Sequence, residues 1–182
     1  MIGTARIRLR PTLIDDLDFV VGVEQDEANR PHITPWDRTQ HEAAVRFPDF
    51  RHFVIEEAGT PEAGGRSVPV GFVILIGCRN PNRSIELKRI VIQAKGRGLG
   101  RACVRLLKRV AFQDLGAHRF WLDVRLHNAR AQALYDSEGF VQEGLLRDCV
   151  KTDAGWESLA VMSMLEGEWR DRCDAGREQA AS

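Results

Sequence analysis

The segment "SIELKRIVIQ", residues 84–93, most constrains what this chain can fold into, because its alternation of apolar and polar residues changes phase. Apolar residues occupy odd positions up to Leu87 and even positions from Ile90 onward. A strand can keep one buried face across such a shift only if it contains an extra residue, so the pattern predicts a β-bulge near Lys88 and Arg89. The alternative is a strand that is buried on both faces at its end. Bulges often lie beside functional sites.

A glycine-rich loop follows this strand at once and leads into a predicted helix. Glycines alternate in "KGRGLG", Lys95–Gly100, and the helical spacing of apolar residues continues to Leu115. The first turn of a helix offers unpaired backbone N–H groups and a partial positive charge, and glycines let an anion approach the backbone closely. The stretch therefore predicts a phosphate-binding loop. It is not a Walker loop, because no Lys-Ser or Lys-Thr follows, and its glycine spacing and context differ from the dinucleotide-binding fingerprint.

The charges are balanced overall but unevenly distributed. The chain of 182 residues holds 26 Lys and Arg and 26 Asp and Glu, which argues against a nucleic-acid-binding protein. Residues 13–62 contain twelve acids and four bases, whereas residues 88–110 contain eight bases and no acid. A local basic patch in a neutral protein favours a compact anionic ligand, although an ordinary solvated helix face has the same pattern.

Cysteine usage and hydropathy predict a cytoplasmic protein. The four cysteines, at positions 78, 103, 149 and 173, form no CxxC pair, so neither a zinc site nor a redox motif is indicated and we expect no bound metal. No apolar run has the length of a membrane span, and the N-terminal residues lack an apolar signal core. We therefore expect free thiols and no membrane partner.

The remaining periodicity predicts a single α/β domain. Strands are expected at 6–10, 52–57, 70–77, 84–93, 119–124, 140–147 and 157–165, and helices at about 15–24, 39–46, 98–115 and 128–139. This order, βααβββ, glycine loop, αβαββ, is typical of an α/β sandwich with a mixed sheet. We predict that residues 1–167 form this domain and that residues 168–182 form a polar C-terminal tail.

The glycine loop also resembles a signature of a known family. "KGRGLG" is similar to the pattern R/Q-x-x-G-x-G/A of the GCN5-related N-acetyltransferases (GNATs), with Lys95 where the family usually has Arg or Gln. "NARAQALYDSEGF", residues 128–140, resembles the family's second signature, a helix led by Asn with a Tyr two turns later. The element order agrees over residues 6–165. "RIRLRP" and "ESLAVMSML" most resemble the RimJ/RimL-type branch, which acetylates protein N-termini and various small amines.

The resemblance implies the family's fold and acetyl-CoA as the acetyl donor. That fold is a three-layer α/β/α sandwich around a mixed, mostly antiparallel sheet, with a β-bulge and a place where two strands splay apart. The coenzyme's pyrophosphate would lie on the backbone amides of the loop, and its pantetheine arm would follow the bulged strand. The residues expected to contact acetyl-CoA are Ile90, Val91, Ile92, Lys95, Gly96, Arg97, Gly98, Leu99, Gly100, Arg101, Asn128, Ala131 and Tyr135.

The chemistry would be direct attack of a neutral primary amine on the thioester in a ternary complex. A base must take the amine proton, and Glu86 on the bulged strand is the first choice, with His127, Asp123 or water as alternatives. A backbone N–H freed by the bulge and splay would stabilise the oxyanion, and the resemblance makes Tyr135 the acid that protonates the leaving thiolate. In ordinary structural roles, Glu86 would be an exposed carboxylate, Tyr135 a packing residue and Asn128 a helix cap.

The expected acceptor is a primary amine, either a protein or peptide N-terminus or a small amine. The acidic surplus of residues 13–62, which includes the family's acceptor side, hints at a cationic acceptor but also fits a solvated surface. A homodimer is a further expectation, because dimers are common in this branch, and pocket volume would decide whether longer acyl chains are used. A second hypothesis is a binding module of the same fold that retains an acyl-CoA without turnover.

Overall fold

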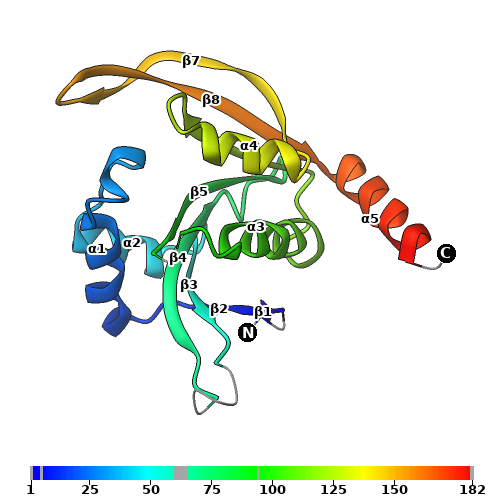
Figure 1. Ribbon diagram of the computed structural model, residues 1–182, viewed down its shortest axis with the longest axis horizontal. Helices are drawn as coiled ribbons and strands as arrows, with labels where there is room; N and C mark the ends of the chain where they lie inside the picture. The colour runs from blue at the N-terminus through cyan, green and yellow to red at the C-terminus, as the bar shows by residue number, and fades with distance from the viewer. Residues whose placement is uncertain (1, 5, 60–64, 94, 181–182) are drawn as a thin grey trace.

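The computed structural model describes residues 2–4, 6–59, 65–93 and 95–180 and is built around one mixed sheet (Figure 1). Its eight strands lie in the order β1-β2-β3-β4-β5-β6-β8-β7. All neighbouring strands pair antiparallel except β5 and β6, which are parallel. The strands are β1 (Ile2–Gly3), β2 (Ile7–Pro11), β3 (Arg51–Glu57), β4 (Val68–Ile76), β5 (Ser84–Ile92), β6 (Arg119–Arg125), β7 (Val141–Thr152) and β8 (Gly155–Leu165). The predicted strands are confirmed, and the two-residue β1 is added at one edge.

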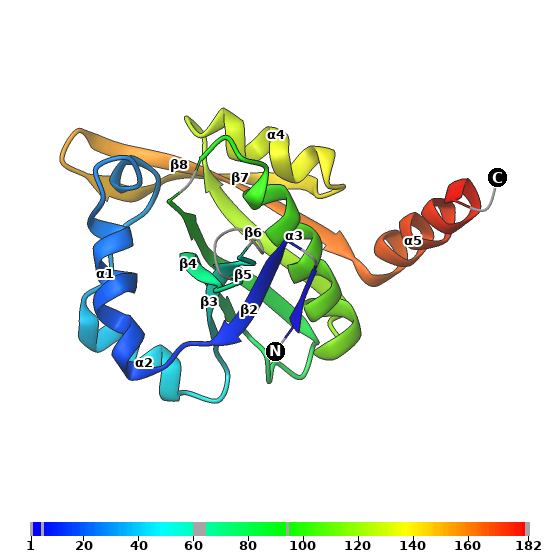
Figure 2. The ribbon, with the colours of Figure 1, turned by 60° about the horizontal axis from the view of Figure 1, so that its bottom comes forward.

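Helices cover both faces of the sheet and make three layers, as the predicted sandwich requires (Figures 1 and 2). One face carries α1 (Leu17–Gln25) and α2 (Arg38–Arg46), and the other carries α3 (Leu99–Arg109) and α4 (Ala129–Ser137). A π-helical turn, Val110–Asp114, extends α3. The fold class is therefore confirmed.

Each helix layer has its own buried cluster. Leu99, Cys103, Leu106 and Leu107 of α3 pack with strand residues such as Phe120 in the larger cluster, which explains the amphipathic pattern of this helix. On the other face, the apolar side of α1 packs against β4 and β5 in a smaller cluster that contains Leu17, Val20, Val23, Phe72, Ile74 and Val91. The sheet is thus held between two apolar layers.

The β-bulge predicted in β5 is confirmed. Ile74 of β4 lies opposite Arg89, and the next residue, Leu75, lies opposite Leu87, so Lys88 is the extra residue. Apolar residues before and after the bulge thereby pack on the same cluster. Arg89 and Val91, which face the α1 layer, are buried, whereas Ile90 and Ile92 on the opposite face are only half-buried, so the alternative of a strand end buried on both faces does not hold.

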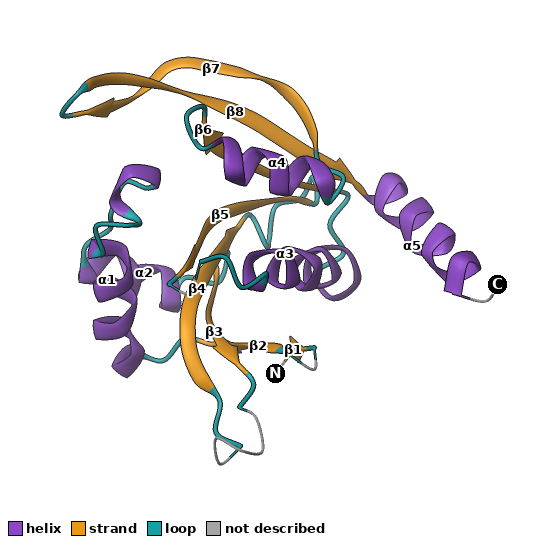
Figure 3. Cartoon of the chain, in the orientation of Figure 1, coloured by secondary structure: helices purple, strands orange, loops and turns teal. Residues whose placement is uncertain are grey.

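The predicted splay is found between β5 and β6. The two strands pair only where Ser84–Glu86 lies beside Arg119–Trp121. Beyond that point no pairing joins them within the described parts of the chain, and the later halves of both strands diverge (Figure 3). The bulge and the splay therefore lie on the same strand, one directly after the other.

The C-terminal segment has a regular structure that its sequence did not predict. Residues 168–182 are predicted as a polar tail, but the structure has a helix, α5 (Glu166–Ala180), that extends away from the sheet (Figure 1). Trp169 stacks on Phe112, with ring centroids 5.3 Å apart, and so joins the larger cluster. The sequence did not indicate this helix, because its only packed apolar side chain is Trp169 among the described residues, and one apolar residue does not make the periodic stripe by which a helix is predicted. In the described part of the chain, no helix is both long and apolar enough to cross a membrane.

Candidate active site

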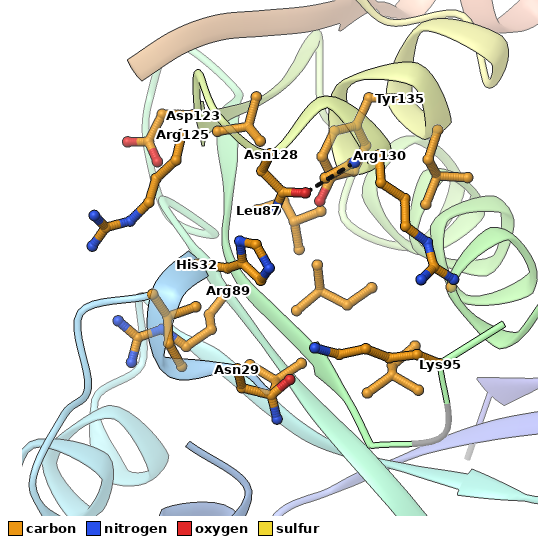
Figure 4. A pocket seen from close by; sticks show the side chains of 18 of the residues that line it. Asn29, His32, Leu87, Arg89, Lys95, Asp123, Arg125, Asn128, Arg130 and Tyr135 are labelled. Atoms are coloured by element: carbon orange, nitrogen blue, oxygen red, sulfur yellow. Dashed lines mark hydrogen bonds between the residues drawn. The ribbon is translucent and has the colours of Figure 1, made fainter. Parts of the chain in front are cut away.

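A cleft of about 1080 Å³ opens where β5 and β6 separate (Figure 4). Its walls are the second half of β5, the glycine loop, the end of β6, the outer face of α4 and the loop between α1 and α2. Figure 4 shows Lys95 and Arg130 on one side of the cleft and Arg89, Asp123 and Arg125 on the other. We call the second side the loop end, which is lined by Ile33, Thr34, Trp36, Asp123, Val150 and Leu159.

The glycine loop adopts a conformation that requires glycine. Gly96 and Gly98 have φ angles of +83° and +75°, in the left-handed region that other residues rarely adopt. A Cβ atom at Gly96 would meet no atom within 4 Å, and one at Gly98 would meet only a guanidinium nitrogen of Arg6, at 3.5 Å. The space in front of this backbone is therefore open. Because α3 begins at Leu99, its first N–H groups have no intrahelical acceptor and remain available to an anion.

Two of the cations near the loop face the cleft and one does not. Lys95 lines the cleft, and its ammonium donates a hydrogen bond to the Ala28 carbonyl oxygen. Arg130 also lines it, and its guanidinium makes no hydrogen bond or ion pair with any other described residue. Arg97 lies off the cleft and pairs with Glu57, at 2.8 Å. The sequence prediction included Arg97 and missed Arg130. The only indication of Arg130 in the sequence was a basic residue two positions after the helix cap, Asn128.

Much of the positive charge on the basic face of α3 is neutralised by one carboxylate of the protein itself, that of Glu138. Arg101, Arg105 and Lys108 all bond to the carboxylate of Glu138, at 2.7, 3.0 and 3.1 Å. Burial alone would raise the pKa of Glu138, but these hydrogen bonds outweigh burial and lower it. Three cations share one carboxylate, so the cluster keeps a net positive charge beside the cleft, and Arg101 lines the cleft directly.

Helix α4 brings Asn128, Ala131 and Tyr135 to the cleft wall, as predicted. The Asn128 side chain accepts a hydrogen bond from the Ala131 N–H, at 3.2 Å, so it caps the helix as well as facing the cleft. Tyr135 is 7% exposed, packs edge-on against Phe140 and extends its ring toward the cleft (Figure 4). Its hydroxyl makes no hydrogen bond within the described chain. Burial raises the pKa of Tyr135, so the hydroxyl keeps its proton at neutral pH.

The three candidate bases have different surroundings. Glu86 does not line the cleft, and its carboxylate accepts a hydrogen bond from the Lys88 ammonium at 3.1 Å. Asp123 lines the cleft, and its carboxylate forms no hydrogen bond or ion pair with any residue that the structure describes. His127 also lines it, but its Nε2 is 3.0 Å from the Pro31 carbonyl oxygen. A carbonyl only accepts, so Nε2 carries the proton and His127 fastens the loop between α1 and α2.

Internal ion pairs build the loop end. Arg89, on the strand directly after the bulge, pairs with buried Glu24 and donates to the Thr34 carbonyl oxygen at 2.8 Å. Its guanidinium lies 4.7 Å from the centre of the Trp36 ring. Arg125 pairs with Glu157 and donates to the Thr34 hydroxyl at 3.1 Å. These contacts fix the loop between α1 and α2 against the splayed strands.

Two buried histidines, His41 and His52, lie next to Glu24 in the protein interior. Nδ1 of His41 lies 3.1 Å from Nε2 of His52, and Nδ1 of His52 lies 2.8 Å from the Thr12 hydroxyl. Burial, and then the neighbouring His41, lower the pKa of His52 to about 3. The His52 ring is therefore neutral at physiological pH and serves as a structural hydrogen-bonding group.

Comparison with known proteins agrees with this geometry. The model of the acetyltransferase (GNAT) family matches residues 17–140. The chain is 27% identical over 125 residues to a spermidine N(1)-acetyltransferase of Vibrio cholerae, and this match covers 68% of each chain. It is 28% identical over 100 residues to a putative ribosomal N-acetyltransferase of Bacillus subtilis, covering 54% of this chain and 55% of the relative. A crystal structure of spermidine N-acetyltransferase from Vibrio cholerae in complex with CoA and spermine has the same fold, with a TM-score of 0.78 at 23% identity, covering 91% of this chain and 99% of that one.

Proposed function

Because this chain belongs to the acetyltransferase (GNAT) family, and is thus an N-acetyltransferase with acetyl-CoA as donor, we propose that the cleft holds the coenzyme along β5 and the amine at the loop end. One observation supports this most: the glycine loop, the unpaired part of β5 and Tyr135 all line a single cleft. A binding module needs only the first two of these features, whereas acetyl transfer also needs a proton donor for the leaving group.

The donor's phosphates fit the glycine loop. We assign the pyrophosphate to the N–H groups of Lys95–Gly100 and the first turn of α3, because the left-handed glycines leave this backbone open. Lys95, Arg101 and Arg130 add positive charge on the same side of the cleft. The pantetheine arm, whose amides resemble a peptide, would follow Ile90, Val91 and Ile92, where β6 leaves the strand unpaired.

The chemistry then follows from the groups at the point where β5 and β6 separate. The amine lone pair attacks the thioester carbon, a C–N bond forms, and the carbonyl electrons move to oxygen. A backbone N–H of β5 near Ile90 would stabilise this oxyanion. When the intermediate collapses, the C–S bond breaks and the thiolate leaves. Tyr135 would give that sulfur a proton, and its raised pKa keeps the proton in place until the thiolate forms.

We propose Asp123 as the base that takes the amine proton, in place of the first sequence-based choice, Glu86. Asp123 lines the cleft without an ion-pair partner among the described residues, whereas the Lys88 ammonium competes for the Glu86 carboxylate. Glu86 is kept as the second choice, acting through water from outside the cleft wall. His127 is the weakest choice, because its Nε2 proton is committed to the Pro31 carbonyl.

Several finer predictions rest on the sequence alone, either on the family resemblance or on composition and polarity. These are the RimJ/RimL-type branch, a protein N-terminus as acceptor, a homodimer, a domain ending at residue 167 and a cytoplasmic location. The names of the two relatives differ in the acceptor that they suggest, because one is named for spermidine and the other is called a putative ribosomal N-acetyltransferase. The acceptor must therefore be sought in the residues of the loop end.

A panel of amines and peptides tests the proposed function. Purified protein is incubated with acetyl-CoA and with polyamines, monoamines, lysine and peptides that have free or blocked N-termini. Mass spectrometry then detects the acetylated product. We expect transfer to primary amines and no transfer to blocked peptides. Tight acetyl-CoA binding without transfer to any amine would support the binding-module alternative, and parallel reactions with longer acyl-CoAs would show whether the cleft accepts them.

A further inference from the structure

The loop end of the cleft contains very little free negative charge. Of the described residues that line the cleft, only Asp123 is acidic, whereas six are Lys or Arg. The sequence expectation of a cationic acceptor rested on the acidic surplus of residues 13–62. Among the residues of that segment that the structure describes, no acid lines the cleft.

The acids of that segment are used elsewhere in the fold. Arg10 pairs with Asp16 and Glu56, and Arg38 pairs with Asp18 and Glu42. Glu57 pairs with Arg97, and the carboxylates of Asp37 and Asp49 accept hydrogen bonds from backbone N–H groups. Glu24 is fully buried and pairs with Arg89. The surplus therefore stabilises the helices and loops and offers no row of free carboxylates to a polycation.

The cations at the loop end are neutralised one by one. Lys88 pairs with Glu86, Arg89 with Glu24 and Arg125 with Glu157. Once these three pairs are removed from the balance, Asp123 is the single uncompensated charge that the described residues place at this end, and it is negative. One ammonium group would balance it. A second ammonium would lie among paired guanidinium groups without a carboxylate of its own, and an unpaired charge is costly to desolvate.

The rest of the loop end is apolar. Ile33 and Trp36 come from the loop between α1 and α2, and Val150 and Leu159 come from the β7–β8 hairpin. All four are half-buried, so each still presents apolar surface to the cleft. Such a wall gains from contact with a hydrocarbon or aromatic group and gains nothing from a second ammonium.

From this charge balance we infer that the acceptor is a primary monoamine with an apolar body, whose ammonium is recognised by Asp123 before it loses its proton. The inference rests on the proposed function and adds a preference against polyamines, although one relative is named for spermidine. Asp123 would thus bind the charged amine and then take its proton, in the place where the thioester is attacked.

Matched amines of similar length test the inference. Steady-state rates with saturating acetyl-CoA are measured for hexylamine, 1,6-diaminohexane and spermidine. We expect kcat/KM for hexylamine to exceed that for either of the other two by about tenfold or more, because a second ammonium finds no free carboxylate. The Asp123→Asn variant should lose most of the activity toward hexylamine and raise its KM. Glu27→Gln, which changes an exposed acid outside the cleft wall, should leave the order of the three amines unchanged.

The outcomes separate the inference from the function on which it rests. If spermidine or 1,6-diaminohexane is acetylated as efficiently as hexylamine, the inference is wrong and the proposed chemistry stands. The same holds if Glu27→Gln selectively slows the two polycations, because a loop acid would then recognise the second ammonium. If acetyl-CoA binds but no amine is acetylated, both the inference and the proposed function are overturned.

Discussion

Lys88 and Glu86, two residues apart on β5, form an ion pair in which the ammonium nitrogen lies 3.1 Å from a carboxylate oxygen. Lys88 is the extra residue of the bulge and lines the cleft, whereas Glu86 does not. A cation in contact with a carboxylate competes with the substrate proton for that carboxylate. The bulge residue Lys88 therefore makes Glu86, the base that the sequence suggested, a poorer acceptor for the substrate proton.

The first prediction compares Asp123→Asn with Glu86→Gln. Both changes remove one carboxylate and keep the shape of the side chain. If Asp123 is the base, Asp123→Asn should lower kcat by about 10² or more, since general bases contribute about 10²–10⁴, and Glu86→Gln should change it less than about fivefold. Steady-state kinetics with one competent amine measures both. A large loss in Glu86→Gln together with near-normal turnover in Asp123→Asn would return the role to Glu86.

The second prediction concerns the approach of the coenzyme to the glycine loop. Gly100→Ala places a Cβ in the first turn of α3 beside the cleft, where its nearest neighbour is Leu134 at 3.6 Å. We expect a folded protein with clearly weaker acetyl-CoA binding. Gly22→Ala is the matched control, because Gly22 lies in α1 with open space around it. Gly98 is a poorer target, because its left-handed conformation would strain any replacement.

Calorimetry of the Gly100 and Gly22 variants gives the coenzyme affinity, and thermal melts show that both fold. Alanine in a helix is more favourable than glycine by about 1 kcal/mol, so neither variant should lose stability. Equal affinity in Gly100→Ala, Gly22→Ala and the parent would remove close approach at Gly100 from the proposed binding mode.

The third prediction compares Arg130, which the sequence prediction missed, with Arg97, which it included. Arg130 lines the cleft without an ion-pair partner in the described chain, whereas Arg97 lies outside and pairs with Glu57. Arg130→Gln should weaken coenzyme A binding about threefold to tenfold and make it less sensitive to salt, because exposed charge contacts are screened by ions. Arg97→Gln should have a smaller effect.

Titration of both arginine variants with coenzyme A and with dephospho-coenzyme A locates the contact. If Arg130→Gln weakens the first ligand more than the second, Arg130 contacts the 3′-phosphate. An equal loss for both ligands assigns it to the pyrophosphate. If Arg97→Gln causes the larger loss, the assignment of charges around the cleft is wrong.

The sequence predicted the parts of the site that depend on the backbone. The phase change in β5 required an extra residue, and the structure has that residue at Lys88. The alternating glycines required an open loop, and Gly96 and Gly98 have the left-handed angles that only glycine adopts easily. Such features depend on neighbours along the chain, so local patterns are sufficient to find them.

The parts that the sequence missed depend on contacts between distant segments. Whether a carboxylate is free or paired decides the chemistry, and Glu24 pairs with Arg89 across 65 positions of the chain. No local pattern distinguishes Glu86, which pairs with Lys88, from Asp123, whose carboxylate has no partner among the described residues. The sum of charges over residues 13–62, from which a cationic acceptor was expected, does not show which charges neutralise one another inside the fold or which carboxylate faces the cleft.

The fourth prediction concerns pH and stability. Burial lowers the pKa of His52 from its usual 6.5 to about 3, so the folded protein binds fewer protons than the unfolded chain between these values. This contribution to stability is therefore fully present above pH 6.5 and is lost as the pH falls, by up to about 1.4 kcal/mol per pH unit. Between pH 7 and pH 5 the expected loss is about 2 kcal/mol.

Urea unfolding at pH 7, 6 and 5 measures this loss, and His52→Gln is the test variant because Gln cannot titrate and can still form hydrogen bonds. Other titrating groups contribute to both proteins, so the difference between the two pH dependences isolates His52. The variant should lose less stability than the parent at low pH. Identical slopes would show that His52 is accessible to protons in the folded protein.

The last prediction is Tyr135→Phe. The change removes one hydroxyl and keeps the ring that packs against Phe140, so the melting temperature should stay close to that of the parent. The Tyr135 hydroxyl has no hydrogen-bond partner in the described protein, so its removal also leaves no buried group unpaired. If Tyr135 protonates the departing thiolate, only the transition state loses a contact.

Under that mechanism kcat should fall by about 10² to 10⁴ while the affinity for acetyl-CoA changes little, because general acids contribute on that scale. Steady-state kinetics with a competent amine, together with calorimetry and a melting curve, separates the possibilities. Equal, small changes in kcat and affinity would mean that the hydroxyl bonds to sulfur only in the ground state. A kcat within about twofold of the parent would assign Tyr135 to packing, and the thiolate, with an intrinsic pKa near 8.5, would then leave unprotonated or take its proton from water.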